Sequence, residues 1–103
     1  MAGLALVAGC GSTSSARYTV VGKIDQGASI TKFLVVDPGA TRSDLKEIAG
    51  NACGQSRNYC HLLFWDSQAK AATGFPLSEQ QVASQLGWYK VNRGNGYESL
   101  ELQ

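Results

Sequence analysis

The order of patterns between residues 30 and 65 constrains the fold more than any other feature of the sequence. Residues 30–36 (ITKFLVV) are apolar on both faces toward their end, which is typical of a central strand. Residues 59–65 (YCHLLFW) form a second and more apolar strand pattern. Between them a helical stripe is formed by Leu45, Ile48, Ala49 and Ala52. A strand, a helix and a strand within so short a span predict a parallel pair joined by a right-handed crossover.

The remaining elements surround this unit. Residues 17–24 alternate as a strand and precede a hairpin loop, and residues 88–91 and 97–102 predict two strands around a glycine-rich loop. Capping-box pairs predict both helix starts: Thr41 with Asp44, and Ser78 with Gln81 before a short helix that ends at Gly87. The predicted order is ββαβαββ. We expect an α+β two-layer sandwich, with two helices on one face of a four- or five-stranded mixed sheet.

Composition limits the chain to one domain and excludes one class of partner. The 103 residues are 44% hydrophobic and 17% charged, as in an ordinary globular domain. Nine Lys and Arg against eight Asp and Glu give a net charge of +1, and the basic residues are scattered singly. Because binding a polyanion requires a concentrated basic surface, we expect no nucleic-acid partner.

The amino-terminal residues carry the most specific motif. Residues 1–9 (MAGLALVAG) form an apolar run that is too short to span a bilayer and resembles the end of a secretory signal. The segment Leu6-Val7-Ala8-Gly9-Cys10 resembles the lipobox of bacterial lipoproteins, in which an aliphatic residue and small residues precede the cysteine that becomes the mature amino terminus. In that family the thiol is acylated and the signal is removed. An apolar tail without this role is the alternative.

The resemblance implies a division of the chain and a location. Residues 1–9 are the truncated lipoprotein signal peptide, because no Lys or Arg precedes the short apolar run. Residues 10–16 are the lipidated cysteine and a flexible tether rich in Gly, Ser and Thr, and residues 17–103 are a single α/β domain. The membrane is then a partner through the lipid anchor. The expected location is the bacterial cell envelope, with the domain facing the periplasm or the exterior.

A secreted location bears on the state of the other two cysteines. With Cys10 committed to lipid, Cys53 and Cys60 form an even pair in an oxidising compartment, which favours an intrachain disulfide. Such a short loop contributes roughly 2.5 kcal/mol on the chain-entropy model. A buried thiol pair and a metal site are the alternatives, although two cysteines and His61 fall short of a tetrahedral zinc set. We expect neither a metal nor a cofactor.

No residue cluster predicts catalysis. The strand pattern places His61 and Asp66 on opposite faces, the serines near helix starts are explained as caps, and no nucleophile elbow occurs. The aromatic residues are more suggestive, because Trp and Tyr are favoured at binding surfaces. The candidate binding surface is Trp65, Trp88, Tyr89 and Tyr97, with core filling as the alternative.

These observations predict an envelope lipoprotein whose small, non-enzymatic domain binds an envelope protein or a glycan of the cell wall. A small membrane-proximal hydrolase or transferase is one alternative. A structural accessory lipoprotein is another.

Overall fold

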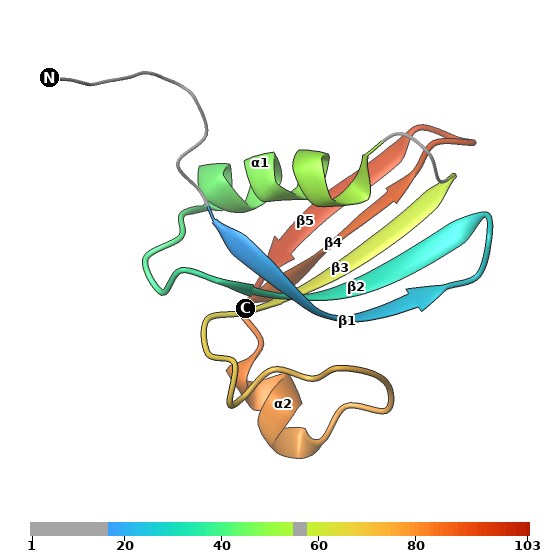
Figure 1. Cartoon of the computed structure of the whole chain (residues 1–103). Helices are drawn as coiled ribbons and strands as arrows, with labels where there is room; N and C mark the ends of the chain where they lie inside the picture. Colours follow the sequence, from blue (N-terminus) through green and yellow to red (C-terminus); the bar gives the residue numbers. More distant parts are fainter. Residues whose placement is uncertain (1–16, 55–57) are drawn as a thin grey trace, which may run out of the picture.

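The five strands of the described residues belong to one sheet, shown in Figure 1. The computed structural model describes residues 17–54 and 58–103. The strands lie in the order β1-β2-β3-β4-β5 and comprise β1 (Tyr18–Asp25), β2 (Ser29–Val36), β3 (Tyr59–Trp65), β4 (Gly87–Asn92) and β5 (Tyr97–Leu102). Only β2 and β3 are parallel. The predicted α+β class, the ββαβαββ order and the mixed sheet are therefore confirmed.

The crossover between β2 and β3 is made by α1 (Arg42–Cys53). Its predicted capping box is present: Thr41 Oγ1 accepts from the Asp44 amide at 3.1 Å, and Asp44 Oδ2 accepts from the Thr41 amide at 2.9 Å. The predicted stripe is buried and packs on alternate residues of the central strands, which include Leu34, Leu62 and Phe64. This contact forms the main core.

The opposite face of the sheet has a smaller core of its own. Phe33, Leu63 and Trp65 are buried there together with Ala72 from the segment that follows β3. Phe75 of the same segment lies edge-on against Phe33, with ring centroids 5.1 Å apart. This segment therefore covers the sheet where β2 and β3 are apolar on both faces.

The second helix, α2 (Glu79–Ser84), lies on the side of the sheet opposite α1 (Figure 1). Its capping box of Ser78 with Gln81 is present as predicted, and the Gln81 carbonyl accepts from Trp65 Nε1 at 2.9 Å. The placement differs from the expected arrangement of both helices on one face. The reason is that the segment leading into α2 covers the second apolar face of β3, and Trp65 on that face donates to the helix.

A β-bulge in β1 changes the side of the sheet to which its side chains point. The pairing with β2 shifts between Val20 and Gly22, so Tyr18 packs on the main core whereas Val21 and Ile24 pack on the smaller one. The simple alternation expected for residues 17–24 therefore does not hold, because a bulge inserts one extra residue. A Cβ at Gly22 would lie 2.4 Å from the Thr73 carbonyl oxygen, so only glycine permits this close approach.

Gly22→Ala should destabilise the domain by about 1–3 kcal/mol, because the methyl group must displace backbone atoms. Gly50→Ala is the matched control: a Cβ there meets nothing within 4 Å and Gly50 lies within α1. We expect it to stabilise the fold by up to about 1 kcal/mol through helix propensity. Urea unfolding of both variants measures the two changes. Equal stability of Gly22→Ala and wild type would contradict the packing described for the segment after β3.

Candidate functional site

The disulfide predicted between Cys53 and Cys60 is present. Their Cα atoms are 5.9 Å apart, and both side chains are buried. Cys53 is the last residue of α1 and Cys60 lies at the start of β3, so the bond joins the end of the crossover helix to the strand it leads into. The bond thus stabilises the crossover between the parallel strands β2 and β3.

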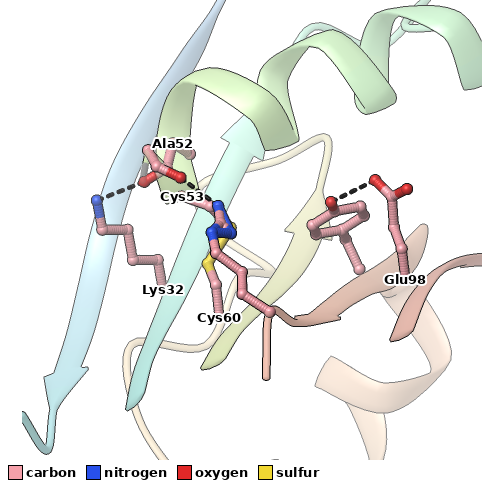
Figure 2. Close-up of a disulfide and its surroundings, with 8 residues drawn as sticks. Lys32, Ala52, Cys53, Cys60 and Glu98 are labelled. Carbon is pink, nitrogen blue, oxygen red and sulfur yellow. Dashed lines mark hydrogen bonds between the residues drawn. A yellow bond between two sulfur atoms is a disulfide. The ribbon is translucent and has the colours of Figure 1, made fainter. Parts of the chain in front are cut away.

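Two cations from distant parts of the chain reach the same helix end. Lys32 Nζ of β2 donates to the Ala52 carbonyl at 2.8 Å, and Arg93 Nη2, from the loop after β4, donates to the Gly54 carbonyl. Figure 2 shows Lys32 and Ala52 beside the bond between Cys53 and Cys60. The last turn of α1 contains no basic residue, so these two side chains supply the positive charge that a helix carboxyl terminus favours.

The four aromatic residues of the candidate surface do not lie together. Trp65 is fully buried in the smaller core, and Tyr89 is buried against α1, where its hydroxyl donates to Glu98 Oε2 at 2.6 Å. Trp88 is half-buried and Tyr97 is 52% exposed. Strand alternation places these last two residues on the face opposite α1. Two of the four side chains are therefore available to a partner.

Trp88 and Tyr97 belong to a larger surface that we call the open face. The cross-strand register aligns Tyr59 with Asn92 and Tyr97 in one row, and His61 with Lys90 in the next. All of these side chains are half-buried or exposed, and neither buried core cluster includes them. The open face consists of Tyr59, His61, Trp88, Lys90, Asn92 and Tyr97. It combines aromatic rings with amide and ammonium groups, a composition suited to binding.

The one histidine of the chain lies in the middle of the open face. Burial and, to a smaller extent, the charge of Lys90 lower the pKa of His61 from 6.5 to about 4. The imidazole is therefore neutral near pH 7 and is a weak proton acceptor. Its nearest ionisable neighbour in the register is an ammonium group and not a carboxylate, so the contacts seen here do not raise its basicity.

Within residues 17–54 and 58–103, no three His, Cys, Asp or Glu side chains are grouped so that they could hold a metal ion. Neither helix of this part of the chain has the length and apolar character needed to cross a bilayer. Comparison with family models, with curated proteins and with solved structures finds no match to this chain.

The imidazole of His61 should titrate with a midpoint of about 4 by NMR. Because the unfolded chain binds this proton near pH 6.5, the folded state should lose stability as the pH falls from about 6.5 to about 4. Lys90→Gln should raise the midpoint but leave it below 6.5, because the larger cause is burial. Lys46→Gln, on the other side of the sheet, should leave it unchanged. A wild-type midpoint near 6.5 would show that His61 is solvated.

Proposed function

We propose that this protein is a secreted lipoprotein that is anchored to a bacterial membrane through Cys10 and binds a partner in the cell envelope. Residues 10–16 act as the tether and lie outside the described residues. The disulfide between Cys53 and Cys60 is the observation that carries the proposal, because such bonds persist in oxidising compartments. This support for a secreted location is independent of the lipobox-like segment, because the two cysteines lie far from it in the sequence.

The domain acts as a binding module and not as an enzyme. The open face supports this role, because Tyr97 is exposed and Trp88 has surface left for contact. Aromatic side chains provide large contact area at low entropic cost, and Lys90 and Asn92 add hydrogen-bond donors around them. An envelope protein or a cell-wall glycan is the partner that fits this combination.

Anchoring is tested by phase separation in a cloud-point detergent, with the chain expressed behind a complete signal sequence. Wild-type protein should enter the detergent phase, since two or more acyl chains hold a protein stably at a membrane. Cys10→Ser should move it to the aqueous phase, whereas Ser14→Ala, a control in the same segment, should not. Recovery of the wild-type protein in the aqueous phase would rule out the lipid anchor.

Binding is tested by crosslinking in the intact envelope followed by purification of the complexes. Tyr97→Ser and Lys90→Gln should each reduce recovery of the partner by about fivefold or more, because they remove an exposed ring and a charged group from the open face. Val20→Ser is the matched control, since Val20 is 41% exposed and lies on β1 at the other edge of the sheet. The open face is not the binding surface if all three variants recover the same partner as wild type. Digestion of the cell wall before purification separates a glycan from a protein.

A further inference from the structure

The loop at the tip of the β4–β5 hairpin holds two asparagines in nearly the same setting (Figure 1). The side-chain oxygen of Asn92 accepts from the Gly94 amide at 3.0 Å, and that of Asn95 accepts from the Tyr97 amide at 2.9 Å. Both side chains are therefore folded back along the backbone in Asx turns. The two asparagines differ in the state of the backbone amide that follows each of them.

That following amide is the nucleophile when an asparagine loses ammonia, because its nitrogen attacks the side-chain carbonyl carbon. The Arg93 amide, which follows Asn92, donates to the Asn58 carbonyl at 2.8 Å and is held by this bond. In the part of the chain that the structure describes, the Gly96 amide, which follows Asn95, donates no hydrogen bond. Attack at Asn95 therefore breaks no existing contact of the nucleophile.

The other two asparagines of the chain also precede engaged amides. Asn51 lies within α1, where the Ala52 amide takes part in the helical hydrogen bonds. Asn58 precedes Tyr59, whose amide donates to the Ala28 carbonyl at 3.0 Å. The fold thus ties the neighbouring nitrogen at three asparagines and leaves it free at Asn95.

The residue after Asn95 also leaves the nitrogen accessible. Gly96 has no side chain to shield its amide, and a Cβ placed there would meet nothing within 4 Å. Both Asn95 and Gly96 are exposed, so water reaches the side-chain carbon and the leaving group can depart. A cyclic product can therefore form without displacing packed atoms.

The hydrogen bond from Tyr97 favours the same reaction. When the Gly96 nitrogen attacks, negative charge develops on the side-chain oxygen of Asn95, and the Tyr97 amide already donates to that oxygen. A donor placed where charge develops lowers the barrier of such an addition. The turn also restricts the side chain to conformations near the backbone, which reduces the entropy lost in closing the ring.

We propose that Asn95 is a modification site, at which the folded protein loses ammonia and acquires aspartate or isoaspartate. The bond that forms joins the Gly96 nitrogen to Asn95 Cγ, and the bond that breaks is Cγ–Nδ2. The amide proton of Gly96 is lost to solvent, and the departing nitrogen takes up a proton and leaves as ammonia. Water then opens the succinimide ring at either of its two carbonyl groups. The reaction is a hydrolysis overall and needs no other reactant.

The product changes the edge of the open face. It places a carboxylate two residues from Tyr97 and lowers the formal net charge of the chain from +1 to neutral. Isoaspartate also lengthens the main chain of the hairpin loop by a methylene group. The modification itself is independent of the membrane anchor and of any partner, so failure of the proposed function leaves it standing.

The test is incubation of the full chain, with its disulfide intact, at mildly alkaline pH, followed by peptide mapping with mass spectrometry. Asn95 should convert about tenfold or more faster than Asn92, because the amide after Asn92 must first break a hydrogen bond and its residue carries a side chain. Methylation by an isoaspartyl methyltransferase distinguishes isoaspartate from aspartate. Equal conversion of Asn92 and Asn95 in the folded protein overturns the inference.

Two comparisons separate the fold from the local sequence. A synthetic peptide of residues 90–98 lacks the sheet, and Asn95 should convert in it at a rate within about threefold of that in the folded protein. Gly96→Ala should slow the reaction at Asn95 about tenfold, since a side chain then shields the nitrogen. Conversion of Asn95 that is tenfold or more slower in the protein than in the peptide would show that the fold protects this residue, and would overturn the inference.

Arg93→Gly is the matched variant, because it gives Asn92 the same neighbour as Asn95. In the folded variant the amide after Asn92 still faces the Asn58 carbonyl, so Asn92 should remain about fivefold or more slower than Asn95. In the peptide with the same substitution the two rates should agree within about twofold. NMR spectra establish that the variant is folded. Equal rates at both asparagines in the folded variant would contradict the role assigned to the free amide.

Discussion

The end of α1 is the point on which the rest of the structure depends. The crossover helix must return the chain to the sheet beside β2, and the disulfide of Cys53 with Cys60 holds that return at 5.9 Å between Cα atoms. Lys32 and Arg93 add hydrogen bonds from β2 and from the loop after β4 to the same helix end. A covalent bond and two charge-assisted contacts therefore fix the helix across the strands from β2 to β4. A domain of this size gains from such a tie, because its core is small.

The position of α1 determines which surfaces remain free. The helix covers the central strands on one face, and the segment after β3 covers only the part of the other face that contains Phe33, Leu63 and Trp65. The open face is what this partial cover leaves.

Local signals in the sequence predicted most of the elements correctly. Capping boxes, helical spacing and strand alternation depend on neighbouring residues, and the structure has the two helix starts and the strands near the expected places. The side of the sheet to which each side chain points was harder to predict. The bulge near Gly22 changes the alternation of β1, and the four aromatic residues divide between two cores and the open face because adjacent strand residues point to opposite sides. The contacts of Lys32 and Arg93 join residues 20 and 39 positions apart, so no local pattern could indicate them.

A secreted protein should carry this disulfide in the compartment where it resides. Unreduced protein purified from the cell envelope can be alkylated in denaturant, so that burial cannot protect a thiol, and its peptides analysed by mass spectrometry. We expect Cys53 and Cys60 to be recovered as one disulfide-linked pair with neither thiol alkylated. Quantitative alkylation of both cysteines would contradict it, and would remove the main support for a secreted protein.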